Sequence, residues 1–284
     1  MAGRLSIIDV AVTGLARALR SLPGLLAIYW LPWMLGTIVL LIVQVMLLAL
    51  EAMTQDPAGV RWATAWASEL VWAPFAAMTY LMLLRWMLNG EPPGRPINLD
   101  VGRQTWIATP VVALLLVADA TASDAPMAML RWLPSNTLAG RWEDAMPYVL
   151  AFRALAWLAN GALFACLFSM IVVVAQVGWP DLGAYQHLLR LQPLRLLCIF
   201  LLATAAIGGL RHLGWEALAW LGAGQLQPST MLPWRAYMRQ AFVAQLPYFP
   251  LHFLEFAIEG SILAEAYRRL LAQPQAPQRE AVQT

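Results

Sequence analysis

Residues 22–50 read LPGLLAIYWLPWMLGTIVLLIVQVMLLAL, a run without a single charged side chain. A transmembrane helix needs about 20 consecutive, mostly apolar residues. This run is long enough to cross a bilayer, and a soluble core would have no place for so much uninterrupted apolar surface. The stretch therefore predicts a membrane-spanning helix.

The composition of the whole chain agrees with a membrane location. Of its 284 residues, 61% are hydrophobic and only 12% are charged, and the mean hydropathy is +0.62. Soluble domains carry about 25% charged residues. All 18 basic residues are arginines, yet they form no basic run and the net charge is only +2. This pattern excludes a nucleic-acid partner.

Further apolar runs predict an all-α, polytopic membrane helix bundle with about six transmembrane helices and amphipathic interfacial helices. The third run is the weakest, because Pro110 lies near its start and Asp119 closes it. We expect one transmembrane domain over residues 1–271 and a polar, proline-rich tail over 272–284, which should be disordered. The expected spans cover about 25–50, 70–88, 104–120, 152–178, 194–211 and 248–267.

An amphipathic elbow helix is expected at residues 5–22, before the first span. Ser6 can cap it by accepting a hydrogen bond from the backbone N–H of Asp9, and Arg17 and Arg20 should reach the lipid headgroups. Its apolar face, which should lie on the membrane, holds Leu5, Ile8, Val12, Leu15 and Leu19.

A weak internal repeat accompanies this elbow. Asp9, Asp100 and Asp181 each begin a short amphipathic stretch that leads through a proline into an apolar span. One interpretation is three copies of an elbow helix followed by a transmembrane hairpin, a three-fold hairpin repeat. The other is that each return to the membrane surface needs an acidic helix cap. The pattern leaves both open.

The arginine distribution predicts the orientation. With the N-terminus inside, eleven of the 18 arginines fall in cytoplasmic segments and seven outside. This excess follows the positive-inside rule. We therefore expect a multi-pass protein of the bacterial cell inner membrane with both its N- and C-termini in the cytoplasm.

The order of elements ends on Ala266-Tyr267-Arg268-Arg269-Leu270. The layout, an elbow, six spans and this closing Tyr-Arg pair, resembles YciC-like inner-membrane proteins and the membrane domain that accompanies some glycerophosphodiester phosphodiesterases. The resemblance implies a role in envelope lipid handling. It implies no catalytic residue, because nothing in the sequence corresponds to the soluble barrel of those phosphodiesterases.

Motifs for common enzyme chemistry do not occur. The sequence contains no Walker A loop, dinucleotide-type glycine pattern, Gly-x-Ser-x-Gly elbow or His-Glu-x-x-His. We assign no catalytic, cofactor-binding or metal-binding residue, and an enzyme is the less favoured class. Cys166 and Cys198 stand in apolar runs and are interpreted as small buried hydrophobic residues.

One constellation of polar residues lies inside a predicted span. His252, Glu255 and Glu259 are three and four residues apart, which places them on one face of the sixth helix. Glu259 should lie roughly 12 Å and Glu255 roughly 18 Å from the cytoplasmic end of that helix. Carboxylates at such depth cannot face lipid. With Arg153 and Asn160 of the fourth span they form the candidate intramembrane polar site.

Two roles are open for this site. The favoured one is a fixed hydrogen-bonded network with Asn160, Thr79 or Tyr80. The other is a proton or cation relay with His252 at its outer end. A wet cavity beside the carboxylates would favour the relay, and a dry interior would favour the network.

The sequence therefore predicts an integral inner-membrane protein without an enzymatic motif, acting in envelope lipid handling or membrane-complex assembly. Its expected partners are membrane lipids and either another membrane protein or a second copy of the chain. The first alternative is a secondary transporter or cation relay that uses Glu255 and Glu259. The second alternative is a membrane enzyme that acts on lipids.

Overall fold

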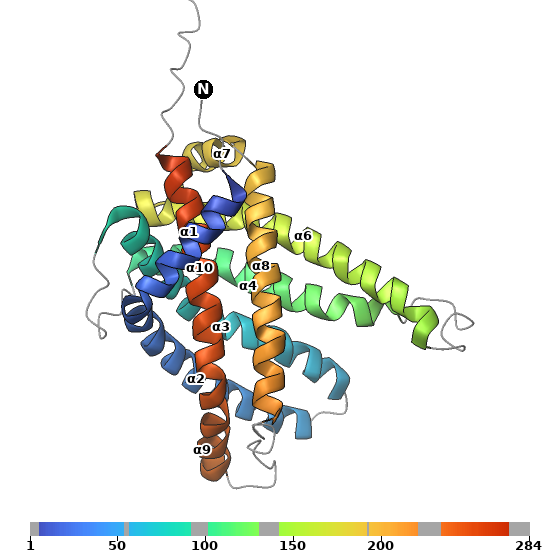
Figure 1. The fold of residues 1–284 in the computed structure, drawn as a ribbon. Helices are drawn as coiled ribbons and strands as arrows, with labels where there is room; N and C mark the ends of the chain where they lie inside the picture. Colours follow the sequence, from blue (N-terminus) through green and yellow to red (C-terminus); the bar gives the residue numbers. More distant parts are fainter. Residues whose placement is uncertain are drawn as a thin grey trace, which may run out of the picture.

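The computed structural model describes residues 6–53, 57–91, 102–130, 142–191, 193–220 and 234–272, and these residues contain helices and no strand. This confirms the all-α class. In chain order the elements (Figure 1) are α1 (Ile7–Arg20), α2 (Leu22–Met53), α3 (Pro57–Asn89), α4 (Arg103–Leu130), α6 (Trp142–Val177), α7 (Leu182–Leu191), α8 (Pro193–Trp220), α9 (Trp234–Gln245), a 3-10 turn (Leu246–Tyr248) and α10 (Phe249–Leu271).

Six stretches of the described helices are long and apolar enough to cross a membrane, which confirms a multi-pass membrane protein. The third agrees with the expected span, but the helix that carries it, α4, continues through Asp119 to Leu130. The sixth begins earlier than residue 248, since α9, the 3-10 turn and α10 follow one another directly. The stretches are Leu22–Leu47, Trp66–Asn89, Arg103–Thr121, Met146–Val177, Pro193–Leu210 and Ala236–Leu271.

Helix α10 is the central element of the bundle. It contacts α1, α2, α3 and α8, and Figure 1 shows it running beside α8 with α1 crossing its upper part. Every residue from Gly260 to Tyr267 is buried, so this half of α10 is enclosed on all sides. The Tyr267 hydroxyl lies 2.7 Å from the Ser169 Oγ of α6, a buried hydrogen bond that ties these two helices together.

Helix α1 is a separate element folded back onto the bundle. Its N-cap is the predicted one, because the Asp9 N–H donates to the Ser6 Oγ at 3.4 Å. Gly14 and Ala18 are buried on one side, against α10 and α8. The expected apolar face, from Ile8 to Leu19, is exposed. In a membrane protein that face is available to lipid.

A buried carboxylate fastens α1 to α10. The Glu265 side chain has no exposed area and accepts hydrogen bonds from Arg17 of α1 at 3.1 Å and from Arg268 and Arg269 at 2.7 Å. Arg269 also pairs with Asp9 of α1. We call these five residues the α1 clamp. The Arg17 guanidinium binds Glu265 while its side chain stays partly exposed, and its expected contact with the lipid headgroups stays a prediction.

The expected repeat is only partly visible. Helices α1 and α7 are short and separate, and Figure 1 places both near the same end of α10. The Asp181 carboxylate caps α7 by accepting from the Gly183 N–H at 2.8 Å. The middle copy has no elbow of its own in the described residues, since α4 runs unbroken from Arg103 through Pro110. Asp100 and the tail from residue 273 lie outside the described residues.

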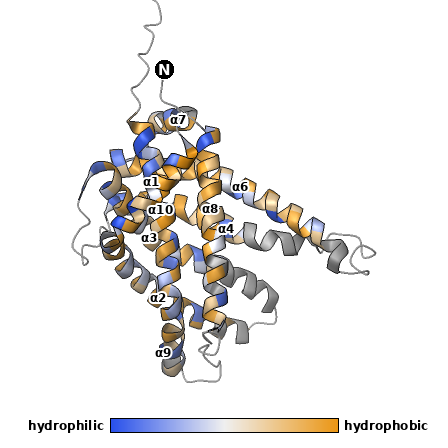
Figure 2. Ribbon diagram, in the orientation of Figure 1, coloured by the Kyte–Doolittle hydropathy of each residue, from blue (hydrophilic) through white to orange (hydrophobic). Residues whose placement is uncertain are grey.

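The interpretation of the two cysteines as buried residues was wrong. Cys166 on α6 and Cys198 on α8 are both exposed free thiols. Figure 2 shows that these helices consist largely of hydrophobic residues. In a membrane bundle the lipid-facing surface is as apolar as the interior. An apolar sequence run therefore does not tell a buried position from a lipid-facing one.

Candidate functional site

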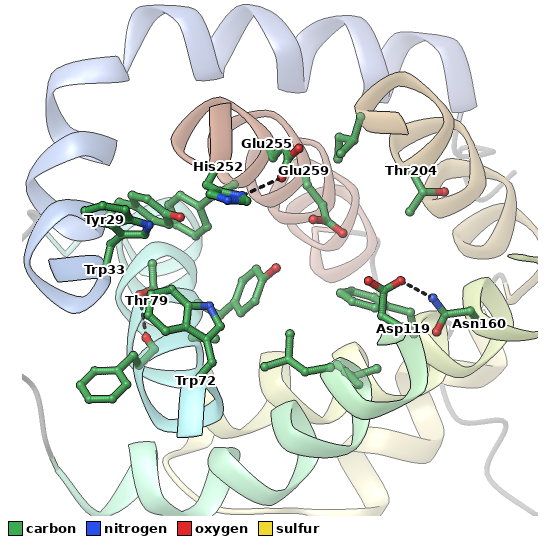
Figure 3. Close-up of a pocket in the computed structure, with 18 of the residues that line it drawn as sticks. Tyr29, Trp33, Trp72, Thr79, Asp119, Asn160, Thr204, His252, Glu255 and Glu259 are labelled. Atoms are coloured by element: carbon green, nitrogen blue, oxygen red, sulfur yellow. Dashed lines mark hydrogen bonds and ion pairs between the residues drawn. The ribbon is translucent and has the colours of Figure 1, made fainter. Parts of the chain in front are cut away.

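A cavity of about 380 Å³ lies inside the bundle, between α2, α3, α4, α6, α8 and α10. All of its lining residues belong to the candidate membrane spans. Figure 3 shows polar side chains pointing into it from several helices. These polar residues are Thr79, Asp119, Asn160, Thr204, His252, Glu255 and Glu259.

One wall is the polar face of α10. The predicted spacing places His252, Glu255 and Glu259 together, and all three line the cavity. The Nδ1 of His252 lies 3.4 Å from the Oε2 of Glu255. Glu255 is only 6% exposed, and its side chain lines the cavity. Helix α10 thus brings an imidazole and two carboxyl groups to one surface.

The opposite wall carries a third carboxyl group, that of Asp119 on α4. It accepts a hydrogen bond from the Nδ2 of Asn160 on α6 at 2.8 Å, and Figure 3 shows the pair facing α10 across the cavity. The Oδ1 of Asn160 is buried and has no hydrogen-bond partner among the described residues. Asn160 therefore fixes the position of Asp119 while keeping an acceptor of its own unused.

Aromatic side chains form most of the remaining lining. Tyr29 of α2 stacks on Phe256 of α10 with ring centroids 5.0 Å apart, and Phe164 of α6 stacks on Phe200 of α8 at 4.3 Å. Stacked pairs of this kind hold their rings in defined orientations. The other aromatic lining residues are Trp33, Trp72, Phe75, Tyr80 and Trp157.

The structure unites four of the five candidate site residues and separates the fifth. Arg153 is exposed and does not line the cavity. It precedes Asn160 on α6 by two helical turns, roughly 10 Å along the axis. The structure therefore places Arg153 outside this cavity, although both residues fall on a similar side of the helix.

Asp119 and Thr204 are the polar lining residues that sequence reasoning missed. Asp119 was interpreted as the end of a span, and Thr204 stood in an apolar run without a distinguishing pattern. An acidic residue within a continuing helical pattern was the available signal for Asp119.

Three of the residues that line the cavity are exposed, namely Asp119 on α4, Trp157 on α6 and Gly208 on α8, so the cavity reaches the protein surface beside them. The Trp157 Nε1 donates to the Thr204 Oγ1 at 3.0 Å and so bridges α6 and α8 there. We call Asp119, Trp157 and Gly208 the mouth of the cavity.

Comparison with known proteins does not assign this site: no known protein family, curated protein or solved structure matches the chain. Within the described part of the chain, no three His, Cys, Asp or Glu residues are grouped so that they could hold a metal ion. The chemistry that the cavity offers is that of carboxyl groups and one imidazole, which can bind and release protons or accept a cation.

Proposed function

We propose that this chain is a secondary carrier or cation relay of the bacterial inner membrane, in which Glu255 and Glu259 take up a proton or a cation inside the bundle. One observation supports this proposal above all others. The two carboxyl groups line a cavity within the candidate spans, together with Asp119, rather than a packed interior. This favours the relay over the lipid-handling role that the sequence suggested first.

The energetic cost of these groups supports a role in function. A charged carboxylate near the middle of a bilayer costs at least about 2.5–3.5 kcal/mol in insertion experiments. The described residues that line the cavity include three carboxyl groups and no arginine. A bound proton or cation would lower the cost of placing these carboxyl groups in the membrane. Groups that bind one and release it again are what a coupled carrier requires.

Competing roles fit the cavity less well. A lipid phosphate inside it would meet carboxyl groups of the same charge, which is unfavourable. The fixed-network interpretation is supported by the His252–Glu255 and Asn160–Asp119 hydrogen bonds. A purely structural network, however, does not need an enclosed space beside it.

Transport in reconstituted vesicles tests the proposal. Proteoliposomes containing a pH-sensitive dye are given a pH gradient, and proton flux is compared with that of protein-free liposomes. We expect flux from the wild type, and its loss in Glu255→Gln and Glu259→Gln, because glutamine keeps the shape but cannot ionise. Glu91→Gln removes a carboxyl group at an exposed position after α3 that does not line the cavity, and it should keep the wild-type flux.

The folding of each variant is checked separately by its elution, so a loss of flux can be told from a loss of structure. If both cavity variants elute as folded protein and still carry wild-type flux, the relay is wrong and the carboxyl groups are structural. A wild type without flux above that of empty liposomes would also reject it.

We also propose the orientation, with both termini in the cytoplasm. The excess of arginines in the segments on that side supports it. A reporter enzyme active only in the cytoplasm should be active when fused after Gln273, and one active only in the periplasm should be silent there. The opposite result would invert the topology or remove one span.

A further inference from the structure

The size of the cavity points to a ligand larger than a simple ion. Its volume is about 380 Å³, whereas one water molecule occupies about 30 Å³ of liquid. The space would hold roughly ten waters by that measure. Small-molecule sites in proteins range over about 300–1,000 Å³. Proton transfer alone would need only a single row of water molecules. Most of the cavity volume would then not be needed.

The residues that line the cavity favour a ligand that carries a positive charge on an apolar body. Asp119, Glu255 and Glu259 supply three carboxyl groups from two opposite walls. Aromatic residues, including Tyr29 and Trp72, line the same cavity. A cation is attracted to the faces of such rings and most strongly where water is excluded. An anion would be repelled by the carboxylates, and a neutral apolar molecule would gain no attraction from them.

The position of the mouth indicates where such a ligand comes from. Trp157 and Gly208 belong to candidate spans of α6 and α8. The neighbouring residues on these two helices, Leu155, Leu158 and Leu202, are exposed. In a membrane these leucines contact lipid. The mouth therefore opens onto a lipid-facing surface, and a ligand that enters there must first dissolve in the bilayer.

We propose that the cavity binds a hydrophobic organic cation, which enters from the bilayer through the mouth between α4, α6 and α8. This inference rests on the proposed carrier function and specifies its cargo. The carboxyl groups bind the positive charge, the aromatic walls bind the apolar body, and the Trp157–Thr204 hydrogen bond closes the entrance. Release of the cation is the event that protonation of Glu255 or Glu259 would drive.

A pair of ions with the same shape and opposite charge tests the charge selection. Tetraphenylphosphonium and tetraphenylborate are each titrated by equilibrium dialysis against the wild-type protein in nanodiscs, with empty nanodiscs as the blank. We expect saturable binding of the cation only. In Glu255→Gln/Glu259→Gln its affinity should fall about tenfold or more, the size of a lost charge-assisted contact. Glu91→Gln, at an exposed position outside the cavity, is the control and should bind as the wild type.

Equal binding of both ions, no saturable binding of the cation, or unchanged affinity in the double variant would each overturn the inference. These results do not depend on the flux assay, since dialysis needs no gradient. Proton flux without cation binding would reject the cargo and leave the relay intact. Cation binding without flux would reject the relay and leave a binding protein.

Two adjacent glycines on α8 test the entrance. Gly208 and Gly209 are both exposed, and a Cβ added to either would meet no atom within 4 Å. Only Gly208 lines the cavity. Gly208→Phe should therefore slow the association of tetraphenylphosphonium, whereas Gly209→Phe should leave it unchanged. Equal association rates in the two variants would place the entrance elsewhere and overturn the lateral route.

Discussion

Replacing Glu265 by glutamine should destabilise the protein by about 3 kcal/mol, a large effect for one substitution that keeps the side-chain shape. The Glu265 carboxylate is completely buried and is the common acceptor for Arg17, Arg268 and Arg269. Breaking a buried ion pair costs about 3–5 kcal/mol, because the remaining charge is left without compensation. Here the three arginines are partly exposed and regain some hydration, so the lower end of that range applies.

The same geometry predicts an asymmetry within the α1 clamp. In Arg17→Met, Glu265 keeps two of its three arginine partners and methionine keeps the apolar stem. The loss should then be about 1.5 kcal/mol, the lower end of the range for a single hydrogen bond to a charged group. Unfolding by titration with a denaturing detergent measures both variants. Glu91→Gln, at an exposed position after α3, is the control and should change nothing measurable.

A Glu265→Gln variant as stable as Glu91→Gln would show that the clamp does not hold α1. The pH dependence adds a further check. The hydrogen bond from Arg269 holds the pKa of Asp9 below its ordinary value. The contribution of this pair is therefore present above the ordinary pKa of an aspartate and is lost only as the pH falls through the lowered value. Between about pH 5 and pH 8 the clamp should not respond to pH.

The sequence predicted the fold well where one signal dominates. Uninterrupted apolar runs locate membrane spans, because lipid tolerates no unpaired backbone groups and so enforces helices. The ends of the membrane spans were harder to predict where polar residues lie within a helix. Asp119 seemed to close a span, yet α4 continues through it, because a carboxylate inside a bundle can face a cavity and need not end the helix.

The candidate site was predictable in part, for a similar reason. Residues on one helix, such as His252, Glu255 and Glu259, follow from helical spacing alone. Which residues of other helices meet them depends on tertiary packing, which the spacing does not contain. Asn160 was found because polar groups in spans are few. Glu265 was missed because it stands next to Arg268 and Arg269, where charge is expected at a membrane boundary, and its burial comes from the docking of α1.

The docking of α1 also depends on a position where no side chain fits. A Cβ added to Gly14 would lie 2.6 Å from the Cα and 3.1 Å from the backbone nitrogen of Ile262 on α10. A flexible side chain could move away from such a contact, but the backbone of a buried helix cannot. Gly14→Val should therefore displace α1 from α10, at a cost of about 3 kcal/mol, the upper part of the usual range for overpacking.

Thiol labelling detects this displacement directly. Ala18 of α1 is 1% exposed, and a cysteine placed there, with Cys166 and Cys198 replaced by alanine, should be protected from a membrane-impermeant maleimide. Adding Gly14→Val should expose it, so that labelling becomes rapid. Gly209→Val, on α8 where the Cβ has open space, should leave the protection unchanged. If Gly14→Val also leaves the cysteine protected, α1 does not pack on α10 through Gly14, and the close approach of the two helices is wrong.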